Sequence, residues 1–178
     1  MNTMSKILKI HELEKTYTRG SKNLTVLTHI SFEIEQGSIF SIVGPSGSGK
    51  TTLAKPLSDL LGGVHINADE VRTKYDDWDF SPEGRMRQAN RMKHLSDGVV
   101  MAGKIAVTDF VCPTAAAREA FNPDYTIWMD TISRGRFEDT NDMFETPEDI
   151  DYHVSEWFED THQKLLEVIS AWMLRKES

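Results

Sequence analysis

The chain has 178 residues, of which 39% are hydrophobic and 27% charged, a composition typical of a globular protein with its own core. Its 28 acidic residues outnumber its 20 basic ones and give a net charge of −8, which argues against a protein that coats nucleic acid. The single cysteine excludes an internal disulfide, and no apolar run reaches the roughly 18 residues that a membrane span needs. We therefore expect a cytoplasmic protein that works without nucleic acid or membrane.

The first predicted elements are strands. Residues 5–11 and 24–35 alternate apolar and polar side chains, and the turn-rich TRGSKN separates them, so we expect an antiparallel pair. The apolar run SIFSIVG, residues 38–44, is typical of a strand buried on both faces. We expect residues 1–37 to form a small β appendage and residues 38–178 to form a separate domain.

Helices and strands alternate after this point. Residues 51–61 have a helical pattern with Pro56 inside it, where the missing N–H should bend the helix. Short strands are predicted at 64–67, 104–110 and 125–130. This alternation predicts an α/β fold whose parallel sheet is flanked by helices.

Two further helices are predicted. Ser81 is a suitable N-cap for a helix that runs to Ala102, and residues 157–173 carry apolar side chains at helical spacing. One face of the earlier helix is apolar through Ala89, Met92, Leu95, Val99 and Ala102. Arg85 and Gln88 project onto that face, where an unpaired charge would be costly, whereas Arg87 and Lys93 point elsewhere. Arg85 and Gln88 are therefore candidates for a ligand contact.

The segment GPSGSGKT fits the phosphate-binding pattern G-x-x-x-x-G-K-[ST] between a predicted strand and a predicted helix. In such a loop, backbone N–H groups converge on phosphate oxygens, the lysine bridges the β- and γ-phosphates, and the last hydroxyl ligates Mg²⁺. The sequence therefore predicts a P-loop NTPase fold that binds ATP and Mg²⁺. The predicted nucleotide-binding residues are Gly44, Pro45, Ser46, Gly47, Ser48, Gly49, Lys50, Thr51 and Thr52.

Residues 6–55 resemble the N-terminal part of an ABC transporter ATP-binding subunit. The stretch KILKIHELEKTYTRGSKNLTVLTHISFEIEQGSIFSIVGPSGSGKTTL is similar to the opening sheet and Walker A motif of that family. The signature segment LSGGQ, the acidic Walker B pair and the switch histidine arrangement are absent, and the chain is too short for the helical subdomain. An ABC-type ATP-binding module without kinase activity stays open as an alternative.

Over residues 38–174 the chain resembles the adenylylsulfate kinase (APS kinase) family. INADEVR (66–72) stands where that family has DGDNVR, and DFSPEGRMRQANR (79–91) partly matches GFSxEDRxENxRR. FVCPTAAAR (110–118) is similar to FISPYRxxR, and MDTISRGRFEDTNDMFETPE (129–148) follows the order of VDTPLE, a lid and PYEAP, with a shorter lid. The resemblance implies a five-stranded parallel sheet and a kinase of sulfate assimilation. Such an enzyme transfers the ATP γ-phosphate to the 3′-hydroxyl of adenylylsulfate and gives 3′-phosphoadenylylsulfate.

The resemblance also implies catalytic and substrate-binding residues. Asp69 matches an aspartate near the acceptor hydroxyl, so it is the catalytic candidate beside Lys50. The alternative is that Asp69 caps the turn that follows. Arg72 and Arg85 match the arginines that hold the phosphosulfate, and Gln88 stands where the family has asparagine.

Two aromatic residues and one acid complete the predicted site. Phe80 and Phe137 match the rings that sandwich the substrate adenine, although either ring could belong to the core. Asp109 ends an apolar strand, where it either supports the Mg²⁺ shell together with Thr51 or caps the strand. The six histidines show no metal-ligand spacing.

Departures from the sequence pattern of the kinase family leave the identity of the acceptor undecided. Ala115 replaces an arginine, Cys112 replaces a serine and is expected to be a buried small hydrophobe, and Gln88 replaces an asparagine. The acceptor is therefore adenylylsulfate or another hydroxyl compound, such as a nucleoside, a modified nucleotide or a sugar. Because members of the family pair, the resemblance also implies a homodimer.

Overall fold

The computed structural model describes residues 6–19, 22–35, 37–132, 142–156 and 161–176. The chain divides into two compact units, one of Met1–Gln36 with Phe158–Ser178 and one of Gly37–Trp157. The expected separation of residues 1–37 from 38–178 as independent domains stays a prediction. None of the helices within the described ranges is long and apolar enough to cross a membrane.

The first unit contains the predicted antiparallel pair. Strand β1 (Lys6–Arg19) pairs with β2 (Lys22–Glu35), so the pairing is confirmed, and both strands are longer than the pattern predicted. Register shifts between Ile10 and Leu13 break the alternation on which the prediction relied. Helix α6 (Thr161–Lys176) contacts β2, while the predicted first turn of this helix lies outside the described residues.

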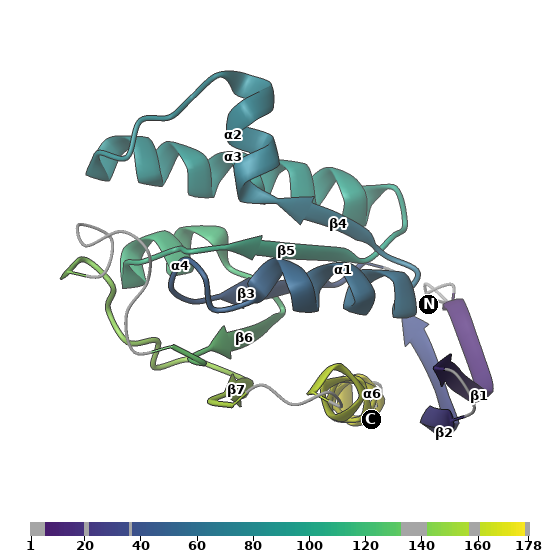
Figure 1. The fold of residues 1–178 in the computed structure, drawn as a ribbon. Coiled ribbons are helices and arrows are strands. Elements are labelled where there is room, and N and C mark those ends of the chain that lie inside the picture. The colour runs from purple at the N-terminus through teal and green to yellow at the C-terminus, as the bar shows by residue number, and fades with distance from the viewer. Residues whose placement is uncertain (1–5, 20–21, 36, 133–141, 157–160, 177–178) are drawn as a thin grey trace. The chain divides into compact units, whose positions relative to one another are not determined.

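The second unit is built on a parallel sheet of five strands in the order β4-β5-β3-β6-β7 (Figure 1). The strands are β3 (Ile39–Val43), β4 (Val64–Asn67), β5 (Ala106–Phe110), β6 (Tyr125–Met129) and β7 (Tyr152–Val154). Both β3 and β5 are buried along their whole length, as expected for strands covered on both faces. The predicted five-stranded parallel sheet of a P-loop NTPase is confirmed.

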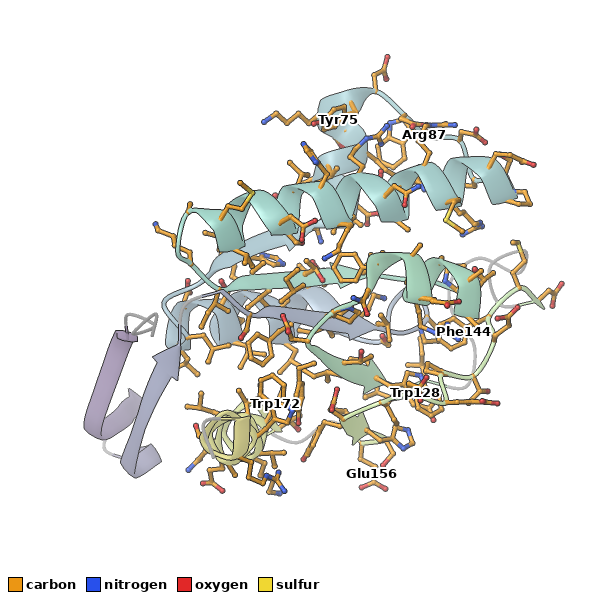
Figure 2. All side chains as sticks on the ribbon, turned by 180° about the vertical axis from the view of Figure 1, so that it is seen from behind. Tyr75, Arg87, Trp128, Phe144, Glu156 and Trp172 are labelled. Atoms are coloured by element: carbon orange, nitrogen blue, oxygen red, sulfur yellow. The ribbon has the colours of Figure 1, made fainter. Side chains whose placement is uncertain are left out.

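Helices cover both faces of this sheet. Helix α1 (Lys50–Leu60) lies on one face, and α3 (Pro82–Met101) and α4 (Ala115–Phe121) lie on the other face, which is turned toward the viewer in Figure 2. Helix α2 (Ala68–Tyr75) contacts α3 and the strands β4 and β5. The core between these layers includes fully buried apolar side chains from β3, α1, α3 and β6, namely Phe40, Ile42, Leu53, Leu57, Met92, Ile127 and Met129.

The first residues of α2 and α3 are set by N-cap side chains that accept hydrogen bonds from backbone N–H groups. Ser81 caps α3 as predicted, because its hydroxyl accepts a hydrogen bond from the Gly84 N–H at 3.1 Å. Helix α2 was not predicted; it begins after Asn67, whose side-chain oxygen accepts from the Glu70 N–H at 2.9 Å. Helix α1 continues through Pro56, which is exposed to solvent.

Candidate nucleotide and acceptor site

The phosphate-binding loop connects the end of β3 to the start of α1. Its first residue, Gly44, has φ +150°, and a Cβ atom there would stand 2.3 Å from the Met129 carbonyl oxygen, so only glycine fits. At the other end, the Lys50 ammonium donates to the Pro45 carbonyl oxygen at 2.7 Å. Burial lowers the pKa of Lys50 from 10.5 to about 8, while the nearby carboxylates of Asp109 and Asp69 act in the opposite direction. Lys50 therefore carries its charge at neutral pH.

A buried hydroxyl in the loop points to an anionic ligand. Within the described part of the chain, Ser48 Oγ is buried and has no hydrogen-bond partner. The Ser48 carbonyl oxygen accepts from the Thr131 hydroxyl at 2.7 Å, which ties the loop to the segment that follows β6. A buried hydroxyl without a partner costs about 1–3 kcal/mol. A phosphate oxygen would supply the missing acceptor, so the loop fits the triphosphate of ATP.

Asp109 lies at the centre of a polar network below the loop. Its carboxylate is 2% exposed and accepts from the Thr51 hydroxyl at 2.5 Å and from the Asn67 amide at 3.0 Å. The His65 Nε2 atom lies 2.8 Å from its other oxygen. Asn67 and Asp109 are register partners on the neighbouring strands β4 and β5, which brings their side chains together.

The Asp109 network fits the expected magnesium site. Thr51 and Asp109 would hold the ion, because hydroxyl and carboxylate oxygens are the ligands that Mg²⁺ prefers. Over the described ranges, the structure contains no group of three or more His, Cys, Asp or Glu side chains that could hold a metal. Such a site would therefore rely on phosphate oxygens and water for its remaining ligands, as magnesium sites commonly do.

A cavity of about 470 Å³ extends from the phosphate loop to the α2–α3 connection. Its lining includes Lys50, Thr51 and Asp109 on the nucleotide side and Asp69, Trp78, Phe80 and Arg85 on the other. A smaller cavity of about 60 Å³ shares Asp69, Phe80 and Arg85 and continues inward to Arg72, Gln88 and Cys112. The volume of the main cavity lies within the range that small-molecule sites occupy.

Asp69 occupies the first turn of α2 and faces the main cavity. Because Asn67 is the N-cap of α2, the alternative that Asp69 caps this turn is wrong. The negative charge of Asp69 acts on Lys50 from within the same cavity. The structure thus brings together the two residues that the sequence predicted to be catalytic.

Arg72, Phe80 and Arg85 form one cluster. Phe80 is 47% exposed, so the alternative that its ring belongs to the core is wrong. The Arg72 guanidinium lies 4.6 Å from the centre of the Phe80 ring, and that of Arg85 lies 5.5 Å from it. Arg85 Nε also donates to the Phe80 carbonyl oxygen at 2.8 Å. Phe137, the predicted second ring, lies outside the described residues.

Gln88 is buried, as the helical pattern predicted, and it makes hydrogen bonds to other residues of the chain. Its amide donates to the Ala68 carbonyl oxygen at 3.0 Å, and its side-chain oxygen accepts from Arg91 at 2.7 Å. Arg91 also donates to the Asp77 carboxylate at 2.9 Å. Gln88 therefore ties the start of α2 to α3, and its contact with substrate stays a prediction.

The sequence pattern missed three residues of the site. His65 and Asn67 contact Asp109 only because of the strand register, which the sequence does not display. For Asn67 a signal did exist, since asparagine before Ala-Asp-Glu is a common helix start. Trp78 lines the cavity from a loop between two predicted elements, where periodicity gives no information.

Comparisons with known proteins agree with both resemblances. A sequence profile described as ABC transporter matches residues 27–167. The macrolide export ATP-binding/permease protein MacB of Vibrio parahaemolyticus serotype O3:K6 (strain RIMD 2210633) is 41% identical over 75 residues, which is 40% of this chain and 12% of that protein. The chain spans only 12% to 29% of the length of the curated relatives that it matches.

Several of the similar solved structures are kinases. The APS kinase CysC of Mycobacterium tuberculosis, in complex with AMPPNP and APS, aligns with a TM-score of 0.64 and 16% identity. That alignment covers 75% of this chain and 98% of the other. A sugar kinase from Janibacter sp. HTCC2649 aligns with a TM-score of 0.56 and 18% identity, over 76% of this chain and 94% of the other. At such identities the likeness concerns the fold.

The fold and the loop define a P-loop nucleotide-binding protein with the fold of small-molecule kinases. Because the family profile covers well over half of its residues, the chain belongs to the ABC transporter family.

Proposed function

We propose that the protein is an ATP-dependent phosphotransferase and that adenylylsulfate is its leading acceptor. The observation that supports this most strongly is one continuous cavity shared by nucleotide-side and acceptor-side residues. A transporter ATPase needs no binding region for a small hydroxyl compound beside its nucleotide, whereas a kinase does. The proposal also includes a cytoplasmic location and a homodimer.

The reaction forms a bond between the acceptor 3′-hydroxyl oxygen and the γ-phosphorus, and breaks the bond from that phosphorus to the β–γ bridging oxygen, releasing ADP. Asp69 orients the hydroxyl and accepts its proton, while the Lys50 ammonium donates to phosphate oxygens as negative charge develops. Thr51 and Asp109 would hold the magnesium ion, which neutralises phosphate charge when it is bound.

The acceptor side is cationic and aromatic. Arg72 and Arg85 place two guanidinium groups at the Phe80 ring, an arrangement suited to an anionic group attached to a flat base. Ala115, in place of the family arginine, removes one expected cation, so a nucleoside, a modified nucleotide or a sugar remains the second candidate acceptor. The fold shared with a sugar kinase supports keeping the sugar in the test.

The decisive experiment is a coupled assay of ADP release with adenylylsulfate and a panel of nucleosides and sugars. Lys50→Ala should reduce turnover by about 100-fold or more, because it removes a donor to the transferring phosphate. Arg85→Ala should raise the acceptor KM by about 10-fold or more, since a charged hydrogen bond contributes about 1.5–3 kcal/mol.

The matched control is Lys93→Ala, which removes a cation from the same helix but outside the cavity lining. It should leave the acceptor KM unchanged. Absence of turnover with adenylylsulfate would remove the leading acceptor, and absence of turnover with the whole panel would remove the kinase.

The second candidate function is an ABC-type ATP-binding module without kinase activity. Family membership and the identity shared with MacB support it. This candidate predicts ATP-dependent pairing with other chains and ATP consumption that no small acceptor increases. Light scattering with and without ATP, run beside the coupled assay, separates the two functions.

A further inference from the structure

Exposed aromatic side chains gather where α2 connects to α3. Among the described residues, the large apolar side chains that are well exposed are Tyr75, Trp78, Phe80 and Met101. Trp78 and Phe80, exposed by 50% and 47%, both line the main cavity with Lys50 and Asp69. Exposed aromatic rings inside a cavity that charged side chains also line are typical of a binding surface rather than of a core.

The arrangement of the Trp78 and Phe80 rings suits a ligand with a single planar ring. Their centres lie 6.3 Å apart and their planes are tilted by 44°. A ring sandwiched between two parallel rings needs a separation of about 7 Å, so Trp78 and Phe80 cannot enclose a guest on opposite faces without moving. A planar ring that stacks on one of them is instead inclined to the other by the same tilt, so it stacks on one ring and contacts the second obliquely.

Arginines of α2 and α3 fix the loop that carries Trp78. Arg72 donates to the carbonyl oxygens of Asp77 and Asp79, the residues on either side of Trp78, at 2.9 and 3.1 Å. Arg87 bonds to the carboxylates of the same two residues at 2.8 to 3.0 Å. Figure 2 shows Arg87 and Tyr75 on the outer side of α3, away from the sheet. Because both neighbours of Trp78 are held, little order has to be gained when a ligand binds.

We propose that Trp78 is a specificity-determining residue that selects an acceptor with a planar heteroaromatic ring, a nucleoside or nucleotide rather than a sugar. This inference rests on the proposed phosphotransferase function and names its substrate class. The APS kinase resemblance gave Trp78 no role and drew the second ring from Phe137. The position of Arg85 beside Phe80 suits an anionic group on the same acceptor.

The test is isothermal titration calorimetry on the full chain, with the phosphate loop first saturated by magnesium and a non-hydrolysable ATP analogue. The probes are adenosine 5′-monophosphate and ribose 5-phosphate, which share a phosphate and a ribose and differ in the base. Trp78→Ala should weaken adenosine monophosphate binding about tenfold, as expected for the loss of one stacking partner. Trp78→Phe should retain most of the affinity, and ribose 5-phosphate should bind weakly and equally to all variants.

Tyr75→Ala is the matched control, because Tyr75 is also 50% exposed, at the end of α2, but packs against Arg91 outside the cavity. It should bind both probes as the unmodified chain does. Equal adenosine monophosphate affinity in the Trp78→Ala and Tyr75→Ala variants would overturn the inference. So would ribose 5-phosphate binding as tight as that of adenosine monophosphate, or no binding of either probe.

The coupled assay distinguishes this inference from the proposed function. Base-dependent binding that needs Trp78, without turnover of any acceptor, supports recognition of a planar base by Trp78 and refutes the kinase. Turnover of a sugar at the same rate in the Trp78→Ala variant supports the kinase and refutes the inference.

Discussion

Replacing Lys50 by methionine should stabilise the nucleotide-free protein and remove its affinity for ATP. The Lys50 side chain is 8% exposed, and burial lowers its pKa from 10.5 to about 8. Each pKa unit corresponds to about 1.4 kcal/mol, so the fold disfavours the charged ammonium by about 3 kcal/mol at neutral pH. The methionine variant also loses the hydrogen bond to the Pro45 carbonyl oxygen, which offsets about 1.5 kcal/mol of the stability gained by removing the buried charge. Methionine keeps the apolar stem, and the net gain should be about 1–2 kcal/mol.

The stability difference between the two proteins depends on pH. Between the folded pKa of about 8 and the ordinary value of 10.5, the unfolded chain binds more protons at Lys50 than the folded chain does. This contribution to the free energy of unfolding therefore rises with pH in the original protein and is missing in the methionine variant. The advantage of the variant should be largest below pH 8 and should shrink as the pH approaches 10.

Urea denaturation of both proteins at several pH values measures this difference, and ATP binding is measured on the same samples. Lys55→Met serves as the control, because Lys55 is exposed on the same helix. The Lys55 variant should show neither the stability gain nor the loss of ATP binding. A Lys50→Met protein that is less stable than the original at pH 7, or an advantage that is constant from pH 7 to 10, would refute the reasoning.

Three further predictions follow from other contacts. Gly84→Ala should lower the free energy of unfolding in urea by about 1–3 kcal/mol, because its Cβ would lie 2.4 Å from the Asp79 carbonyl oxygen. Gly98→Ala in the same helix has open space and should gain up to about 1 kcal/mol; equal effects would contradict the packing. Burial raises the pKa of Cys112 to about 12, so its thiol should stay unmodified by a thiol reagent at pH 8 until urea unfolds the chain, and rapid native labelling would contradict this. Asp109→Asn should weaken magnesium-dependent ATP binding at least about tenfold in a magnesium titration, and an unchanged titration would remove Asp109 from the metal site.

The parts of the fold that could be predicted are those that depend on residues contiguous in the sequence. The phosphate loop, the N-cap Ser81 and the buried strand β3 each depend on a few neighbouring side chains and were found from the sequence. Helix α2, with eight residues, and strand β7, with three, are too short to show a period, and both were missed.

The parts of the site that could not be predicted depend on distant pairs. The Thr51–Asp109 hydrogen bond joins residues 58 positions apart, and the Asn67–Asp109 contact depends on the register of β4 and β5. For Gln88, periodicity correctly placed the side chain inside the fold. The sequence could not show that Ala68 and Arg91 would satisfy its amide.

The close approach of Gly44 to the Met129 carbonyl oxygen changes how the loop motif should be understood in this chain. The first glycine of the motif is required by the neighbouring strand, irrespective of any phosphate. A descendant of this protein that stopped binding nucleotides would still need Gly44 to fold, while Lys50 would be free to change. In such a lineage, loss of the lysine, and not loss of the first glycine, would indicate that the loop no longer binds a nucleotide.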